Sequence, residues 1–215
     1  GFRTTFGNDH PDTLGLINNM GLLLKKQGKY DEAEIYLLEG LEGYRRVFGD
    51  DHPGTLNSVL NMGQLLKAQG KYAEAERLHR EAIDDYRRVL GDDHPSTLAA
   101  INNMGLLLKT QGKYGEAEPY LREALDGNRR VHGPDHPNTL AVVTNLGALL
   151  WVQGKDDEAE RLLREAIDSY RRVLGDDHPH TLNTLNSLGL LLMGQGKYDA
   201  AEPYLLEVLD GSRRT

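Results

Sequence analysis

The chain has 215 residues, of which 27% are charged, and its formal net charge is −8. An acidic chain is a poor candidate for general nucleic-acid binding, which needs a basic surface. The absence of cysteine excludes a disulfide framework, a thiol nucleophile and a cysteine-ligated zinc site. No apolar run approaches the length of a membrane span, so we expect no membrane partner. The lack of cysteine also fits a reducing compartment, and we predict a cytoplasmic location.

A unit of 42 residues occurs five times without insertion or deletion, and 17 of its positions hold the same residue in every copy. Such a period is typical of solenoids, in which each unit packs on its neighbours. The first five residues match the end of a unit, and the chain stops at the last position of one. We therefore expect a segment of a longer array that forms one continuous solenoid domain. Its parts are residues 1–5, the tail of a preceding repeat, and repeats 6–47, 48–89, 90–131, 132–173 and 174–215.

The first half of each unit is predicted to be a helix that starts at proline. In the first unit, Pro11 suits the first helical position, where its missing N–H is not needed. Apolar and small residues then recur at the spacing of one helix face, at Leu14, Ile17 and Gly21. The glycine recurs in the middle of this helix in all five units, which indicates close approach of a neighbouring helix. Gly28 suits the left-handed conformation that ends a helix.

The second half of each unit is predicted to be another helix, so that the unit is a hairpin of two helices of about 16–18 residues. Acidic residues occupy its first turn, and Arg45 and Arg46 its last, which complements the helix dipole. Pro119 and Pro203 lie several residues inside this helix, where proline bends a helix or moves its start.

The histidines do not predict a metal site. Five of the eight precede the proline of each unit, and equivalent residues of neighbouring repeats lie about 8–10 Å apart, too far to share one ion. We interpret these five as helix-start residues. The other three, His79, His132 and His180, are scattered, and we expect them to face solvent.

The pattern resembles a known family. Gly21, an alanine twelve residues later and a small residue seven positions further on are similar to the tetratricopeptide repeat. The length of 42, with His-Pro, Leu-x-x-x-x-Asn, Gln-Gly-Lys-Tyr and Glu-Ala-Glu-Pro, resembles the longer kinesin-light-chain type. Asp156 and Ala200 depart from it, where the other units have Tyr and Glu. The resemblance implies an all-α fold, an α-solenoid with a right-handed superhelix of five tandem helix-turn-helix repeats. It also implies a concave groove, lined by the first helix of each repeat, that holds an extended peptide.

By the pattern of that family, two columns of polar residues face the groove. Asparagine side chains donate and accept hydrogen bonds, so a row of them can hold a peptide backbone of any sequence. The alternative is that they bond the adjacent helix and set the spacing of the repeats. One column holds Asn19, Asn61, Asn103 and Asn145, and the other holds Asn18, Asn102 and Asn186.

A third column changes character along the chain. Lys25, Lys67 and Lys109 are followed by Trp151 and Met193. This arrangement suits an extended ligand with acidic residues at one end and a hydrophobic anchor at the other. The alternative is a solvated row of lysines with a substitution near the end of the array.

No motif for catalysis is present: the sequence has no nucleophile elbow, phosphate-binding glycine loop or His-Glu-x-x-His. Glu39 and its copies are expected to pair with basic residues instead. We predict a non-catalytic scaffold without a cofactor, whose partner is a protein or an extended peptide. The alternatives are end-to-end self-association through uncapped ends and a passive spacer within a larger signalling protein.

Overall fold

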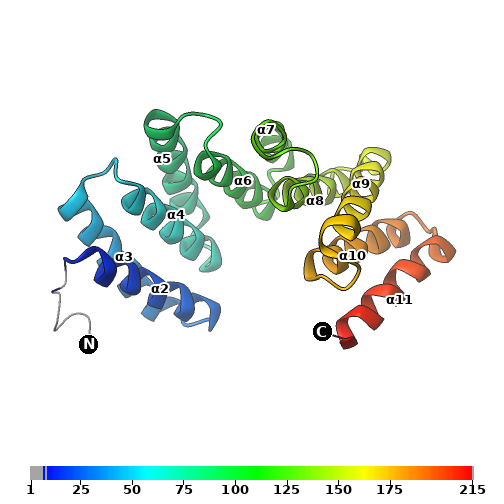
Figure 1. Cartoon of the computed structure of the whole chain (residues 1–215), viewed down its shortest axis with the longest axis horizontal. Helices are drawn as coiled ribbons and strands as arrows, with labels where there is room; N and C mark the ends of the chain where they lie inside the picture. Colours follow the sequence, from blue (N-terminus) through cyan, green and yellow to red (C-terminus); the bar gives the residue numbers. More distant parts are fainter. Residues whose placement is uncertain (1–6, 8, 215) are drawn as a thin grey trace. The chain divides into compact units, whose positions relative to one another are not determined.

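The computed structural model describes residues 7 and 9–214, so the tail predicted at residues 1–5 lies outside the described residues. The described residues form ten α-helices and no strand (Figure 1). The first helices of the five repeats are α2 (Pro11–Lys26), α4 (Pro53–Ala68), α6 (Pro95–Thr110), α8 (Pro137–Val152) and α10 (Pro179–Gly194). The second helices are α3 (Tyr30–Phe48), α5 (Tyr72–Leu90), α7 (Tyr114–His132), α9 (Asp156–Leu174) and α11 (Tyr198–Arg214).

The chain divides into two compact units, Gly1–Leu107 and Leu108–Thr215, with the boundary inside α6. In the first unit α2 packs on α3, α3 on α4 and α4 on α5; in the second, α7 to α11 pack in the same sequential way. The first helices of successive repeats also touch, α2 with α4 and α8 with α10. Sequential packing of helix hairpins confirms the predicted all-α solenoid. The right-handed superhelix and the single continuous domain stay predictions.

Histidine, proline and glycine fix the ends of the first helices. Proline is the first helical residue, and the Nδ1 atom of the preceding histidine accepts the N–H two residues on, at 3.1–3.3 Å in all five repeats. This bond satisfies one of the backbone donors that a helix start leaves open. Gly28 and its copies end the helix with φ between 75° and 78°. The prediction that these histidines start helices is therefore confirmed.

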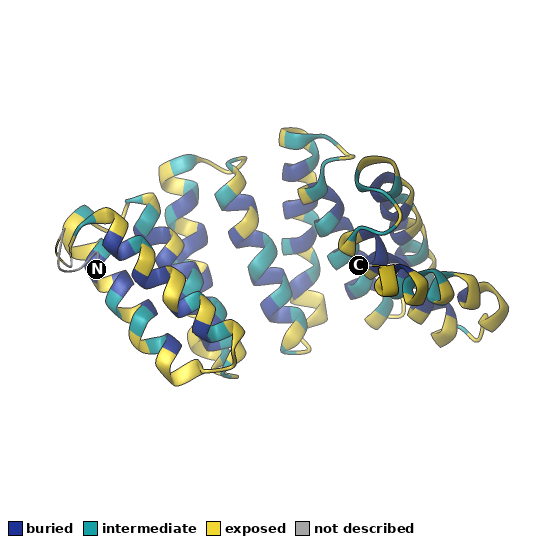
Figure 2. Cartoon of the chain, turned by 60° about the horizontal axis from the view of Figure 1, so that its bottom comes forward, coloured by how far each residue is buried: buried dark blue, intermediate teal, exposed yellow. Residues whose placement is uncertain are grey.

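The two helices of a repeat approach closely at the conserved glycine. A Cβ atom placed on Gly21 would lie 2.6 Å from the Cγ atom of Leu37, which is closer than two carbon atoms can pack. Along the second helices, buried and exposed residues alternate at helical spacing, whereas the first helices α6 and α8 are buried or half-buried over most of their length (Figure 2). The predicted reason for the repeated glycine is confirmed.

The second helices are slightly longer than expected, and four of them run for 19 residues. They continue past the paired arginines to the residue before the next glycine, such as Gly49, whose φ of 81° stops them. The helices with Pro119 and Pro203 begin at Tyr114 and Tyr198, the position used in repeats without proline. Of the two effects expected from proline, a shifted start therefore does not occur.

Candidate functional site

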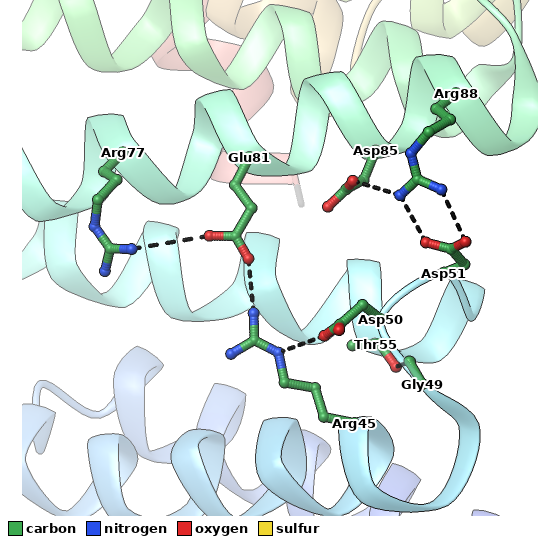
Figure 3. Close-up of polar contacts among 9 residues, drawn as sticks. All are labelled: Arg45, Gly49, Asp50, Asp51, Thr55, Arg77, Glu81, Asp85 and Arg88. Carbon is green, nitrogen blue, oxygen red and sulfur yellow. Dashed lines mark hydrogen bonds and ion pairs between the residues drawn. The ribbon is translucent and has the colours of Figure 1, made fainter.

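Conserved charged residues join successive repeats. In the first unit, Arg45 donates to Glu81 of the next repeat at 2.7 Å and pairs with Asp50 at 3.1 Å (Figure 3). Lys71 pairs in the opposite direction, with Glu34 of the preceding repeat, at 3.1 Å. The second unit repeats both types of pair. They are Arg129–Glu165 at 3.0 Å, Arg171–Glu207 at 2.5 Å, Lys155–Glu118 at 2.6 Å and Lys197–Glu160 at 3.2 Å.

Other conserved residues bond within a repeat. Arg88 binds Asp51 with both of its terminal nitrogens, and Thr55 donates to the carbonyl of Gly49 at 2.7 Å (Figure 3).

The pairs between repeats also shift the pKa of a carboxyl group. Hydrogen bonds from Lys155, Arg122 and Gln153 lower the pKa of Glu118 to about 2, although burial acts in the opposite direction. The conserved carboxylates thus hold the repeats together, and the predicted pairing of the Glu39 column with basic residues is confirmed at its copies Glu81, Glu165 and Glu207.

Two adjoining pockets form a groove along the first helices of the first unit. We call the two together the first-unit groove. One pocket, of about 440 Å³, lies over α4 and α6 and is lined by Lys25, Gln64, Lys67, His79, Asn103 and Leu106, among others. The other, of about 460 Å³, lies over α2 and α4 and is lined by Asn19, Leu22, Leu23, Lys25, Lys26, Asn61 and Gln64. The pockets adjoin, because Lys25 and Gln64 line both.

Two lysines of the first-unit groove, Lys25 and Lys67, are half-buried and held by hydrogen bonds. The ammonium of Lys25 donates to the side-chain oxygen of Gln64 at 2.9 Å, and that of Lys67 to the carbonyl oxygen of Leu106 at 3.3 Å. Burial, followed by the charge of Lys26, lowers the pKa of Lys25. Five predicted site residues are thereby brought together, since these two lysines share the groove with Asn19, Asn61 and Asn103.

His79 is a groove residue that the sequence analysis missed. Its side chain is only 1% exposed, so the expectation that it faces solvent is wrong. It stands where the other four repeats have leucine, beneath Gly63 at the helix crossing. Burial, and then the charge of Lys67, lower its pKa to about 4, so the ring is neutral at pH 7. Its Nδ1 atom has no hydrogen-bond partner among the described residues. Of the other two, His180 is exposed as expected, whereas His132 is half-buried.

Asn18 lies between helices instead of in the first-unit groove. It is 8% exposed and donates to the hydroxyl of Ser58 on α4 at 2.7 Å. In the second unit, Thr144 and Thr184 make the same link between α8 and α10 at 3.2 Å. This column therefore follows the packing alternative at these positions, and its other predicted members, Asn102 and Asn186, are half-buried.

The remaining candidates belong to the second unit. The indole of Trp151 packs beside Gly194, where a Cβ atom would lie 3.4 Å from its Nε1 atom. Met193 is exposed and lines an apolar pocket of about 330 Å³ on α10 and α11. Burial lowers the pKa of Lys109, and Asn145 is half-buried. A ligand that reaches from the lysines to Trp151 stays a prediction, because Lys25 and Lys67 belong to the other unit.

Across the described part of the chain, no group of three or more histidine, aspartate or glutamate side chains is placed to hold a metal ion. None of the helices described is both long enough and apolar enough to cross a membrane.

The sequence model of the tetratricopeptide repeat matches the chain in four overlapping segments, residues 12–88, 57–130, 99–171 and 140–214. The chain belongs to the tetratricopeptide repeat family. This confirms the resemblance inferred from the glycine and alanine columns. No curated protein sequence matches this tetratricopeptide repeat chain.

Several solved structures share the fold. The nearly identical repeats of a putative kinesin light chain from Podosopora anserina have a TM-score of 0.78 at 22% identity, over 95% of this chain and 97% of that one. BtubC (BKLC) from P. vanneervenii has a TM-score of 0.81 at 19% identity, over 94% of this chain and 81% of that one. A Rap protein complexed with Competence and Sporulation Factor has a TM-score of 0.77 at 16% identity, over 92% and 53%. The solved structures that share the fold thus include one with kinesin-light-chain repeats.

Proposed function

We propose that the chain is a non-catalytic scaffold that binds an extended, acidic peptide in the first-unit groove. The observation that carries this proposal is that the two pockets adjoin, with Lys25 and Gln64 lining both, which places Lys25 and Lys67 beside the column of Asn19, Asn61 and Asn103. A protein partner that presents such a segment fits equally well.

The polar residues of the first-unit groove suit a peptide main chain. Each asparagine side chain offers an amide donor and a carbonyl acceptor, the groups that complement a backbone N–H and C=O. Successive asparagines stand on successive first helices, so an extended strand that crosses these helices meets them in turn. The recognition of backbone atoms supplies affinity that is independent of the ligand sequence.

The lysines of the first-unit groove would favour ligands with acidic side chains. Lys25 is half-buried, its pKa is lowered by burial, and its hydrogen-bond partner Gln64 is neutral. A carboxylate that enters the groove would supply a counter-charge, and charge-assisted hydrogen bonds are roughly twice as strong as neutral ones. Leu22 and Leu23 give the other pocket an apolar wall for the stem of a ligand side chain.

The second unit is proposed to supply the hydrophobic anchor, at Trp151 and Met193. The structurally similar Rap protein was solved with a bound factor, which supports ligand binding by this class of fold. At 16% identity that likeness extends to the fold alone.

The test is a peptide array followed by fluorescence anisotropy with the acidic peptides that bind. Lys25→Glu and Lys67→Glu reverse the charge of the first-unit groove, and Lys67→Met introduces the residue that repeat 5 has in this column. Arg77→Glu is the matched control, because it makes the same change of charge on the exposed face of α5. Circular dichroism verifies that each variant is folded.

Binding of acidic peptides that is lost in the lysine variants and kept in Arg77→Glu supports the proposal. Equal binding by all variants would remove the lysines from it, and no binding by the parent chain would favour the spacer alternative. Because Trp151 is the only tryptophan, its emission reports separately whether the ligand reaches the second unit.

A further inference from the structure

One pocket of the first-unit groove contains a buried polar side chain that the repeat itself does not need. His79 on α5 is 1% exposed and lines the pocket of about 440 Å³ over α4 and α6. We call this pocket the His79 pocket. The equivalent position holds leucine in the other four repeats, so the packing of a repeat requires only an apolar side chain there. The imidazole is therefore particular to this pocket.

The imidazole has a polar atom that the helices around it do not satisfy. Its Nδ1 atom is buried and has no hydrogen-bond partner among the described residues. The opposite edge of the ring lies against α4, where a Cβ atom on Gly63 would be 3.3 Å from both Cε1 and Nε2. Buried polar atoms without a partner are uncommon in folded proteins. In a residue that lines a pocket, such an atom is a candidate to contact a ligand.

The groups around the imidazole are cationic or neutral. The charge of Lys67 on α4 acts on the ring from across the pocket. On α5 itself the nearest acidic residue, Glu76, pairs with Arg80 at 2.8 Å. None of the described residues that line the pocket is acidic. The other lining residues are Lys25 from α2, Tyr30 from α3, Gln64 and Ala68 from α4, and Asn103 and Leu106 from α6.

We propose that His79 makes this pocket a subsite for one acidic side chain of the bound peptide, with the carboxylate placed against the imidazole and the ammonium of Lys67. The inference rests on the proposed peptide binding and assigns one position within it. A carboxylate has two acceptor oxygens, and charge-assisted hydrogen bonds are the strong ones. It therefore offers an acceptor to the ring and a counter-charge to the lysine at once. An uncharged amide would leave the positive charge of the pocket unbalanced.

A carboxylate in the His79 pocket has a consequence that can be measured. In the free chain, burial and then the charge of Lys67 lower the pKa of His79 to about 4. A nearby negative charge favours the imidazolium, so this pKa should rise toward its ordinary value of 6.5 in the complex, and the ring takes up a proton from solvent. A pKa that rises on binding makes the ligand bind more tightly as the pH falls. The affinity should be about fourfold higher at pH 6 than at pH 8.

The experiment is fluorescence anisotropy at pH 6, 7 and 8 with a labelled acidic peptide taken from the array. The peptide is amidated at its C-terminus, so that only side chains supply carboxylates, and these stay ionised over this range. His79→Leu introduces the residue of the other four repeats, so it is expected to fold, and its affinity should be independent of pH. His180→Asn is the control, because it removes an exposed imidazole of the second unit and should keep the fourfold change.

Single substitutions in the peptide locate the subsite. Each glutamate is changed to glutamine in turn, and each aspartate to asparagine. One of these changes alone is expected to abolish the dependence on pH in the parent, and it should have a smaller effect on binding to His79→Leu. A double-mutant cycle between that peptide position and His79 measures the coupling.

The outcomes separate this inference from the proposed function. Acidic peptides that bind the parent equally at pH 6 and pH 8 overturn the subsite and leave peptide binding standing. A loss of affinity in His79→Leu that is the same at every pH and for every peptide also overturns it, because it would show a purely structural role for the ring. Absence of binding at every pH overturns the proposed function, and the subsite with it.

Discussion

Replacing His79 by leucine is expected to stabilise the protein and to remove part of its sensitivity to acid. Leucine occupies this position in the other four repeats, and in three of them, at Leu37, Leu163 and Leu205, the side chain packs against the glycine that corresponds to Gly63. The histidine is buried with its Nδ1 atom lacking a hydrogen bond, and such a group costs about 1–3 kcal/mol. At pH 7.5 we expect His79→Leu to raise the free energy of unfolding by about 2 kcal/mol.

The dependence on pH follows from the lowered pKa of His79. In the folded chain this pKa is about 4, against 6.5 for the ordinary side chain that the unfolded chain presents. Between these values the unfolded chain binds a proton that the folded chain does not, so stability falls as the pH drops from 6.5 toward 4. The difference of pKa corresponds to about 3 kcal/mol in full. The advantage of His79→Leu should therefore grow from about 2 kcal/mol at pH 7.5 to about 5 kcal/mol at pH 4.

The assay is urea unfolding at several pH values, followed by circular dichroism and fitted with a nearest-neighbour treatment of the repeats. Carboxylates also lose ion pairs in acid, but both proteins share them, so the difference between the curves isolates His79. His180→Asn is the control, because it removes an exposed imidazole and introduces the residue of repeat 4. A difference between His79→Leu and the parent that stays constant from pH 7.5 to pH 4 would refute the reasoning.

Three further substitutions test the packing and the junctions. Gly21→Ala should lower the free energy of unfolding by about 1–3 kcal/mol in urea denaturation, because its Cβ atom would lie 2.6 Å from Leu37. Gly63→Ala should lower it less, because its Cβ atom would lie 3.3 Å from the ring of His79. Asn18→Ala should cost about 1 kcal/mol through loss of the buried bond to Ser58, and a double-mutant cycle with Ser58→Ala that shows no coupling would contradict this. Arg45→Ala should lower the free energy of unfolding by less than about 1 kcal/mol, since the pair with Glu81 is partly exposed. This effect should shrink in high salt, and an effect independent of salt would argue against an ionic role.

The fold could be predicted from the sequence because most of the positions that are identical in all repeats determine the conformation of the backbone nearby. A glycine with positive φ, a proline at the first helical position and a small residue at a crossing each depend on the backbone nearby. Comparison of the copies could also have located His79, since a column of four leucines indicates burial whatever the fifth residue is. The prediction that His79 faces solvent considered only the polarity of histidine and not the residues at the equivalent positions.

Which side chains line the candidate site was harder to predict from the sequence. Asn18 and Asn19 are neighbours in the chain, but successive residues of a helix point about 100° apart, so one lies between helices and the other lines the first-unit groove. The flexible stem of Lys67 lets its ammonium reach the carbonyl of Leu106, nearly one repeat away in sequence. Such contacts depend on how successive repeats stack, which the spacing within one unit does not determine.

The ion pairs between repeats carry one more consequence, which concerns the length of the array. Each repeat presents the same charged residues to the repeat before it and to the repeat after it, so any block of 42 residues can be removed and the new neighbours still match. Deletion of residues 132–173 would bring Arg129 into the register of Glu207, the copy of its present partner Glu165. An unchanged helical spectrum per residue in this shortened chain would show that the array can gain or lose whole repeats as units, with no compensating substitution elsewhere.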